Sequence, residues 1–260
     1  MLDHSSTTAV ITGGAQGLGF AIAEELIALG CTRLLIVGRS AEKGAIAVAK
    51  LRANGADVGF LCADLGQVDQ AIGAIDAALA RFGTVNALVN AAAATDRGSI
   101  LDTTPQAWEN LMAVNARGPF FALQRFAQAA IAAGHPASAV NILSMVVHCG
   151  QNFLAPYSAS KAALANVTKN AAQALRGHKI RVNGINCGWM DTPGEDETQR
   201  KYHGASDGWL AAAESRQPMG MLVKPGHVAG LVSYMLSPDS GVMTGALVDF
   251  DQNVAGAYPE

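Results

Sequence analysis

Seven short runs of the chain are continuously apolar and rich in β-branched residues, a pattern that predicts buried strands. They lie at residues 7–11, 33–37, 58–61, 85–89, 139–143, 180–185 and 246–249. The segments between them carry apolar residues at helical spacing, such as Leu18, Ile22, Leu26 and Leu29. The longest, 105–133, opens with a proline, a residue favoured in the first turn of a helix.

Strands that are apolar throughout and alternate with helices indicate a parallel sheet that is covered on both faces. Further helices are expected from Ala41 onward, across 68–79 and over 155–176. No low-complexity linker or internal repeat divides the chain, so residues 1–260 are expected to form one α/β domain. The charge-rich segment 192–218 is punctuated by glycine and proline, which predicts a short helical insertion or lid.

The composition excludes several classes of protein. Of the 260 residues, 50% are hydrophobic and 15% are charged, and the net charge is −3. Such a chain can bury a large core and is not intrinsically disordered, and its mildly acidic balance argues against a nucleic-acid partner. Residues 1–8 are polar, and no apolar run approaches the length of a membrane span. We therefore expect a soluble, cytoplasmic protein without a membrane partner.

Two further searches of the sequence give negative results. The four cysteines are scattered and form no CxxC pair, so free thiols in a reducing compartment are expected. The six histidines show no HExxH or other paired spacing, and no serine lies in a GxSxG motif. The sequence therefore predicts neither a metal site nor α/β-hydrolase chemistry.

A glycine-rich turn, 13–19, lies between the first predicted strand and the first predicted helix. In that position, backbone N–H groups and the helix dipole can bind a pyrophosphate, and glycine allows the close approach. A tight turn without a ligand is the alternative, which the surrounding strand–helix alternation disfavours.

The end of the second predicted strand bears on the choice of dinucleotide. An acidic residue there would bind the ribose hydroxyl of NAD, but the chain has Gly38-Arg39-Ser40. A guanidinium can instead pair with the 2′-phosphate of NADP, so NADP is favoured over NAD. A solvated arginine at a helix start is the alternative.

Taken together, seven groups of residues, spread in order over nearly the whole chain, resemble the markers of the short-chain dehydrogenase/reductase family. They are Thr12-Gly13-Gly14-Ala15-Gln16-Gly17-Leu18-Gly19, Asp64-Leu65, Asn90-Ala91-Ala92, Asn115, Ser144, Tyr157-Ser158-Ala159-Ser160-Lys161, and Arg181-Val182-Asn183-Gly184-Ile185-Asn186-Cys187-Gly188 with Thr192-Pro193. The resemblance implies a Rossmann-type, doubly wound parallel sheet of seven strands in the order 3-2-1-4-5-6-7. It also implies NAD(P)-dependent interconversion of a secondary alcohol and a ketone.

The resemblance assigns catalytic roles to four residues. Tyr157 would be the acid/base, and Lys161, one helical turn along, is expected to lower the pKa of that phenol and to hold the nicotinamide ribose. Ser144 would bind the substrate oxygen, and Asn115 would fix a water that links Lys161 to solvent. Taken singly, each residue also has an ordinary structural explanation.

The resemblance also gives two sets of binding residues. The residues expected to bind the cofactor are Gly13, Gln16, Gly17, Leu18, Gly19, Arg39, Ser40, Asp64, Leu65, Asn90, Ala91, Ala92, Tyr157, Lys161, Gly188, Trp189, Met190 and Thr192. The residues expected at the substrate are Ser144, Val146, His148, Gln151, Asn152, Tyr157, Trp189 and Trp209.

The chain departs from the family pattern at two places. Asn90-Ala91-Ala92-Ala93 stands where the family commonly has Asn-Asn-Ala-Gly, which removes an amide that could bond across the sheet. Cys187-Gly188 stands where the family usually has Pro-Gly, which puts the rigidity of the loop beside the nicotinamide in doubt.

The polar groups among the expected substrate residues suit a sugar or polyol. A 3-oxoacyl-type carbonyl reductase, an epimerase or dehydratase on the same fold, and an NADP-binding regulator without turnover are alternatives. The family resemblance further suggests a homotetramer, or a dimer, formed through the helices at 105–133 and 155–176 and the C-terminal strand.

Overall fold

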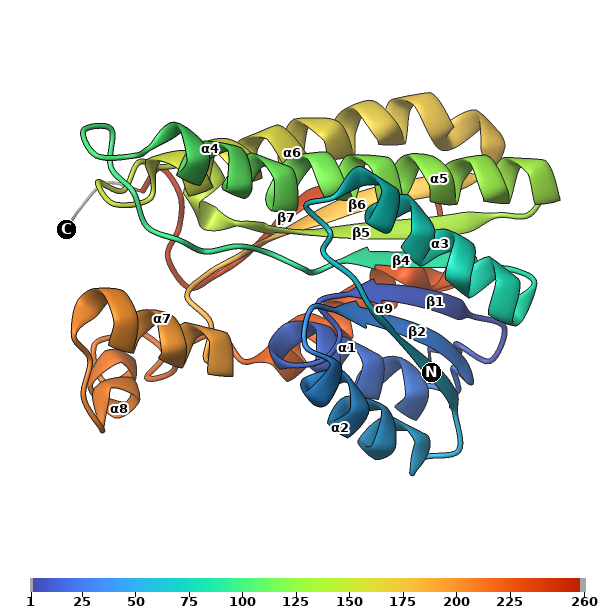
Figure 1. Cartoon of the computed structure of the whole chain (residues 1–260), viewed down its shortest axis with the longest axis horizontal. Helices are drawn as coiled ribbons and strands as arrows, with labels where there is room; N and C mark the ends of the chain where they lie inside the picture. Colours follow the sequence, from blue (N-terminus) through green and yellow to red (C-terminus); the bar gives the residue numbers. More distant parts are fainter. Residues whose placement is uncertain (1, 258–260) are drawn as a thin grey trace.

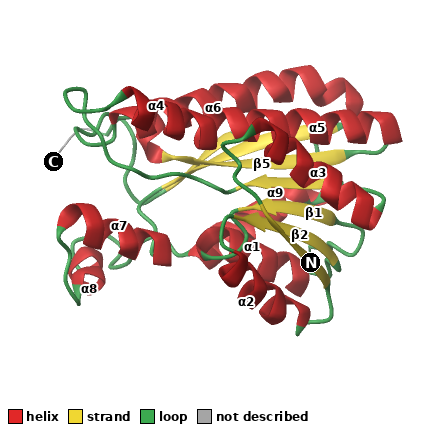
Figure 2. Ribbon diagram, in the orientation of Figure 1, coloured by secondary structure: helices red, strands yellow, loops and turns green. Residues whose placement is uncertain are grey.

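The computed structural model describes residues 2–257, in which a single parallel sheet is enclosed by helices (Figures 1 and 2). The strands run in the order β3-β2-β1-β4-β5-β6-β7, as expected. Their bounds are β1 Thr8–Thr12, β2 Arg33–Gly38, β3 Asp57–Cys62, β4 Ala87–Asn90, β5 Ala137–Ser144, β6 Ile180–Cys187 and β7 Leu247–Phe250. All seven predicted strands are confirmed, because runs that are apolar on both faces are stable only between two layers of helices.

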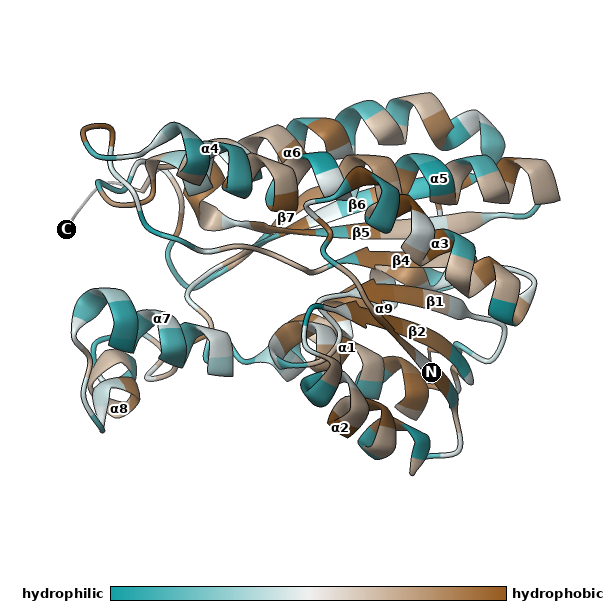
Figure 3. Cartoon of the chain, viewed as in Figure 1, coloured by the Kyte–Doolittle hydropathy of each residue, from teal (hydrophilic) through white to brown (hydrophobic). Residues whose placement is uncertain are grey.

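The helices cover the two faces of the sheet in two groups. Their bounds are α1 Gly17–Ala28, α2 Ala41–Arg52, α3 Val68–Phe82, α4 Pro105–Met112, α5 Gly118–Ala133, α6 Ala155–Leu175, α7 Pro193–His203, α8 Trp209–Glu214 and α9 Pro225–Leu236. Residues of α1, α2 and α9 pack into one core on the first face, and those of α3 and α5 pack into a second core on the other. Figure 3 shows β1, β2 and β4 largely in brown, the apolar colour, whereas brown and teal residues alternate along the helices.

The predicted helix 105–133 is interrupted in the structure. A π-helical segment, Ala113–Arg117, separates α4 from α5. At its end, a Cβ atom on Gly118 would collide with the backbone carbonyl of Leu65, so only glycine permits this approach. The interruption therefore comes from a tertiary contact, which the periodicity of the segment does not encode.

The chain between β6 and β7 forms α7, α8 and α9. The segment 192–218 contains α7 and α8, which lie apart from the sheet in Figure 1. Thr192 caps α7 by accepting a hydrogen bond from the Glu195 N–H over 3.1 Å, and Pro193 occupies the first turn. Helix α9 has no counterpart among the predicted elements, although its buried Val228, Val232 and Met235 follow helical spacing.

Candidate active site

A cavity of about 1370 Å³ opens at the carboxyl ends of the central strands. It is lined by the glycine turn after β1, the ends of β4, β5 and β6, the segment that carries α7, and residues that follow β7. Its volume exceeds the roughly 300–1,000 Å³ of a pocket for one small molecule, and it can hold a dinucleotide together with a substrate. Of the residues predicted to bind cofactor or substrate or to act in catalysis, the described lining omits only Asn90, Asn115, Asn152 and Trp209.

The glycine turn fits the pyrophosphate of a dinucleotide. Gly13 has φ +69°, and a Cβ atom on it would lie 2.9 Å from the backbone of Ala92. A Cβ atom on Gly19 would collide with the Gly13 carbonyl. Helix α1 starts at Gly17 without a side-chain cap and without an acidic residue in its first turn. Its first N–H groups are therefore available to an anion in the cavity.

The wall beside the turn is held by a threonine and two asparagines. The Thr12 hydroxyl accepts hydrogen bonds from the N–H groups of Ala91 (3.0 Å) and Ala92 (3.1 Å). Asn90 is buried, and its Nδ2 donates to Oδ1 of Asn141 over 2.8 Å. The side chain of Asn90 therefore bonds β4 to β5. The chain keeps a bond across the sheet although it has Ala91 where the family commonly has a second asparagine.

Two cationic residues lie at the end of the cavity near β2. Arg39 is exposed, and Ser40 caps α2 by accepting from the Lys43 N–H over 3.2 Å. Nζ of Lys43 donates to Oε1 of Gln16 (2.7 Å) and lies 3.4 Å from the carboxylate of Glu197 on α7. Positive charge therefore collects at this end of the cavity, and Lys43 also joins the helical insertion to the glycine turn.

Tyr157 and Lys161 project from α6, four residues apart, toward the end of β5. Nζ of Lys161 lies 5.8 Å from the centre of the Tyr157 ring and donates a hydrogen bond to the Ile142 carbonyl over 2.8 Å. Burial disfavours the ammonium form and lowers the pKa of Lys161 to about 8. The amine is therefore only partly charged just above neutral pH.

The predicted lowering of the Tyr157 pKa by Lys161 is not found, because burial has the opposite effect. Burial of the phenol raises the pKa of Tyr157 to about 12, and the nearby Ser144 hydroxyl offsets only part of that rise. Desolvation is the largest cause of the shift in both residues, and it disfavours the charged form of each. The phenol is therefore held in its neutral form beside the amine.

Asn115 supports this site from behind without lining the cavity. Its Oδ1 accepts from the Ala94 N–H over 2.8 Å, and its Nδ2 donates to the Ala94 carbonyl (2.9 Å) and to the Ser160 hydroxyl (3.0 Å). Both amide hydrogens are thus used within the protein. The residue lies in the π-helical segment, a distortion that is frequent at functional sites.

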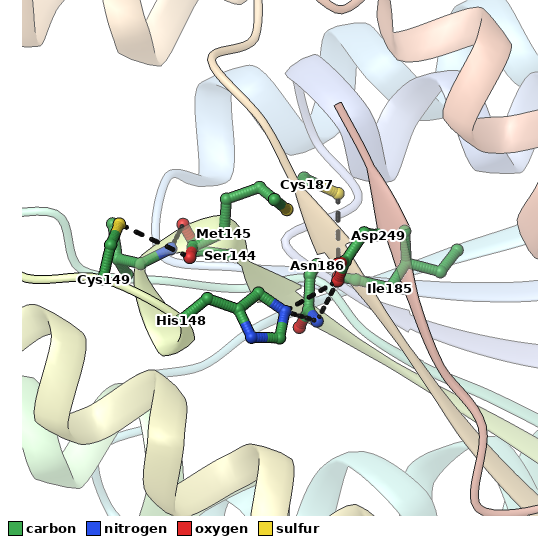
Figure 4. Close-up of polar contacts among 9 residues, drawn as sticks. Ser144, Met145, His148, Cys149, Ile185, Asn186, Cys187 and Asp249 are labelled. Atoms are coloured by element: carbon green, nitrogen blue, oxygen red, sulfur yellow. Dashed lines mark hydrogen bonds and ion pairs between the residues drawn. The ribbon is translucent and has the colours of Figure 1, made fainter. Parts of the chain in front are cut away.

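The residues expected at the substrate fall into two groups. His148 and Gln151 line the cavity, and Nε2 of His148 contacts the carboxylate of Asp249 (Figure 4). Trp209, by contrast, stacks on Trp189 with ring centres 6.2 Å apart. Asn152 is exposed outside the described lining of the cavity.

Several lining residues were missed by the sequence analysis, among them Arg97, Asp251 and Cys187. Arg97 follows β4, donates to the Thr95 carbonyl over 2.9 Å, and lies over the rings of Phe153 and Tyr202. Asp251 follows β7 and packs so closely on Gly188 that a Cβ atom there would collide with its carboxylate. Cys187 was noted only as a departure from the family pattern. A charged residue directly after a predicted strand is the signal that could have found Asp251, whereas Arg97 lies further along the loop after β4 and has no such signal.

Two searches of the described residues bear on other classes of function. Within residues 2–257, no three His, Cys, Asp or Glu side chains gather as a metal ion would require. No helix in that range is both long and apolar enough to cross a membrane.

Comparisons with known proteins agree with this geometry. A family profile described as short chain dehydrogenase matches residues 7–203. The NADP-dependent (R)-specific alcohol dehydrogenase of Lentilactobacillus kefiri is 32% identical over 241 residues, 92% of this chain and 92% of that protein. The galactitol 2-dehydrogenase of Agrobacterium fabrum is 30% identical over 242 residues, 91% of this chain and 92% of that protein. A crystal structure of an actinorhodin polyketide ketoreductase with NADPH has a TM-score of 0.88 and 26% identity, covering 96% of this chain and 97% of that one.

Proposed function

The chain belongs to the short-chain dehydrogenase family, and from that premise we propose that it interconverts a secondary alcohol and a ketone with a nicotinamide dinucleotide. The observation that carries the proposal is the meeting of Tyr157, Lys161 and Ser144 in the cavity that also contains the uncapped start of α1. A phenol, an amine and a hydroxyl around one space suit proton exchange with an alcohol oxygen. An open helix N-terminus suits a pyrophosphate.

The residues of the site divide the tasks of this reaction among them. Ser144 hydrogen-bonds the substrate oxygen, and Tyr157 gives a proton to that oxygen during reduction or takes it during oxidation. Lys161 binds the nicotinamide ribose and stabilises the phenolate that oxidation requires. Both hydrogens of the Asn115 side-chain amide are already donated, so a relay water held by Asn115 would donate to an oxygen of this residue. The dinucleotide, when bound, supplies or accepts the hydride.

We favour NADP over NAD as the cofactor. The support is the pair of cationic side chains, Arg39 and Lys43, on the wall of the cavity after β2, where a guanidinium can pair with a 2′-phosphate. Gly13, Gly17 and the start of α1 would hold the pyrophosphate, and Asp64 and Leu65 line the same cavity and would contact the cofactor. The relative from L. kefiri is named as NADP-dependent, which agrees with this preference.

The proposed substrate is a polar sugar or polyol. His148 and Gln151 offer hydrogen bonds beside Ser144, whereas a long acyl chain would need a more uniformly apolar channel. The relative from A. fabrum is named for oxidation of a polyol. A 3-oxoacyl substrate is the second candidate, favoured by relatives that are named as ketoacyl reductases and as a hydroxyacyl-CoA dehydrogenase.

We also propose that residues 1–260 act as one cytoplasmic domain that assembles as a homotetramer, or else as a dimer. The support for assembly is a set of apolar side chains, Trp108, Phe120 and Ile131, that remain exposed on α4 and α5. Size-exclusion chromatography with light scattering distinguishes these states from a monomer.

The function is tested with the purified protein, both dinucleotides in both redox states, and a panel of polyols, simple secondary alcohols, ketones and 3-oxoacyl thioesters. We expect NADP-linked turnover that is strongest with polyols and that Tyr157→Phe abolishes while the affinity for NADPH stays within about threefold, because the phenol acts in proton transfer. Turnover confined to acyl thioesters would overturn the polyol assignment. Tight NADPH binding with no turnover on the whole panel would make the protein a regulator instead.

A further inference from the structure

Three polar side chains from three segments meet beside the catalytic serine (Figure 4). Asn186 on β6 and Asp249 on β7 are direct partners in the register of the sheet, and His148 follows the short turn after Ser144. Nε2 of His148 lies 2.8 Å from Oδ1 of Asp249, and Nδ2 of Asn186 lies 2.7 Å from the same oxygen. One carboxylate oxygen therefore receives both contacts.

This geometry fixes the hydrogen on the histidine ring. Nε2 lies 2.8 Å from the Asp249 carboxylate and 3.1 Å from the Asn186 amide nitrogen, and the shorter contact, to a group that can only accept, assigns the hydrogen to Nε2. Asn186 must present its amide nitrogen for the same reason, and its buried Oδ1 is left without a partner among residues 2–257. Partial burial acts to raise the pKa of Asp249, but the hydrogen bonds from Asn186 and His148 outweigh burial. The pKa of Asp249 therefore lies below its ordinary value, and the carboxylate stays charged.

The opposite ring nitrogen, Nδ1, is left for a ligand. The side chain of His148 is 37% exposed and lines the catalytic cavity. Nδ1 points away from Asp249 in Figure 4 and has no hydrogen-bond partner within the part of the chain that the structure describes. With Nε2 protonated, Nδ1 of the neutral ring is a hydrogen-bond acceptor.

The place of His148 relative to the catalytic serine limits the size of the ligand. Residues 145–147 form a single 3₁₀ turn, which advances about 2 Å per residue, so Ser144 and His148 are roughly 8 Å apart along the chain. A hydrogen bond spans about 3 Å at each end. The two backbone positions are therefore close enough for one small molecule to reach both side chains.

We propose that His148 is a specificity-determining residue whose Nδ1 binds a second hydroxyl group of the substrate, and that Asp249 and Asn186 are positioning residues that orient its ring. The inference rests on the proposed function, because it names what the cavity recognises beyond the reacting alcohol. A hydroxyl suits Nδ1 in both protonation states, since it can donate to the neutral ring or accept from the charged one. An anionic group would require the charged ring and would lie near the Asp249 carboxylate.

The competing explanation is that the contact with Asp249 only fastens the loop after β5 to β7. Two conservative variants separate these explanations. In His148→Gln, the amide nitrogen reaches the place of Nε2 and keeps the bond to Asp249, but nothing replaces Nδ1. In His148→Asn, the amide lies near the place of Nδ1, but the bond to Asp249 is lost. His178→Gln, at an exposed histidine outside the lining of the cavity, is the matched control.

The experiment compares kcat/KM for 2-hexanol with that for 2,3-, 2,4- and 2,5-hexanediol. We expect the wild type and His178→Gln to prefer at least one diol by about tenfold, the gain expected of one good hydrogen bond. His148→Gln reduces that preference to within about twofold, whereas His148→Asn retains more of it. Asp249→Asn raises KM for the preferred diol more than it lowers kcat.

Three outcomes would overturn the inference. If His148→Gln keeps the preference for a diol over 2-hexanol and His148→Asn loses it, the histidine serves only to fasten the loop after β5 to β7. If 2-hexanol and the diols are turned over with equal efficiency, the site does not recognise a second hydroxyl, although the proposed function still stands. No turnover of any of the four compounds, by a protein that is active on the broader panel, excludes small diols as substrates.

Discussion

The amine of Lys161 lies 5.8 Å from the centre of the Tyr157 ring, one turn along α6, and its hydrogen bond goes to the Ile142 carbonyl. Burial affects both residues, raising the pKa of the phenol to about 12 and lowering the pKa of the amine to about 8. Tyr157 is therefore held as the protonated phenol, the form that donates a proton to a ketone. This arrangement predicts different pH dependences for the two directions of the reaction.

Oxidation of the alcohol should depend on pH far more strongly than reduction of the ketone. Oxidation needs the phenolate, and because burial raises the pKa of Tyr157 to about 12 the phenol stays protonated near neutral pH. We expect kcat/KM for oxidation to rise by up to tenfold per unit between about pH 7 and 9, and that for reduction to change by less than about threefold. Initial rates in both directions, with the same buffers at constant ionic strength, check this. An oxidation rate that falls as pH rises would contradict it.

Replacing the amine should reduce turnover without removing the fold. Lys161→Met keeps a long apolar side chain but loses the hydrogen bond to Ile142 and the positive charge near the phenol, so kcat/KM should fall about 10²- to 10³-fold. Lys169→Met, at an exposed position on the same helix, is the control and should be within about twofold of wild type. Equal activity of the two variants would show that the amine has no part in the reaction.

The seven strands could be predicted from the sequence because continuous burial leaves a local signature, an unbroken apolar run. Tyr157 and Lys161 could be predicted to act together because four residues on a helix share a face. The pairing of His148 with Asp249 could not, because it depends on the register that sets Asn186 beside Asp249 across two strands. The pKa of Tyr157 was also out of reach, since the sign of its shift is decided by burial, which spacing does not reveal.

A methyl group in the glycine turn should weaken cofactor binding. Gly19→Ala places a Cβ atom against the Gly13 carbonyl, so the turn must change shape where the pyrophosphate would bind. We expect the Kd for NADPH to rise by about tenfold or more. Gly73→Ala, on α3 with no heavy atom within 4 Å of the added Cβ, should leave the Kd unchanged and slightly stabilise the helix. Fluorescence titration gives both values, and an unchanged Kd for Gly19→Ala would count against the turn as the phosphate site.

Arg39 should decide between the two dinucleotides. Arg39→Leu removes the guanidinium that can pair with a 2′-phosphate, while the ribose of NADH loses nothing comparable. The ratio of kcat/KM for NADPH over NADH should therefore fall by roughly tenfold to a hundredfold, mostly through KM for NADPH. Arg52→Leu, at the far end of α2, is the control and should keep the wild-type ratio. A fall in the efficiency with both dinucleotides alike would show that the residue has a structural role instead.

The stability of the protein should decline above about pH 9 because of its two buried thiols. Burial raises the pKa of Cys187 to about 12 and that of Cys31 to about 11, both above the ordinary value of 9.0. Between pH 9 and these values the unfolded chain loses protons that the folded chain keeps, so the free energy of unfolding falls as pH rises. Cys187→Ala should reduce the difference between the urea midpoints at pH 7 and pH 10. Cys149→Ala, at an exposed thiol, should not. Because each variant is compared with itself at two pH values, any general effect on packing cancels, and equal declines in all three proteins would exclude Cys187 as a cause.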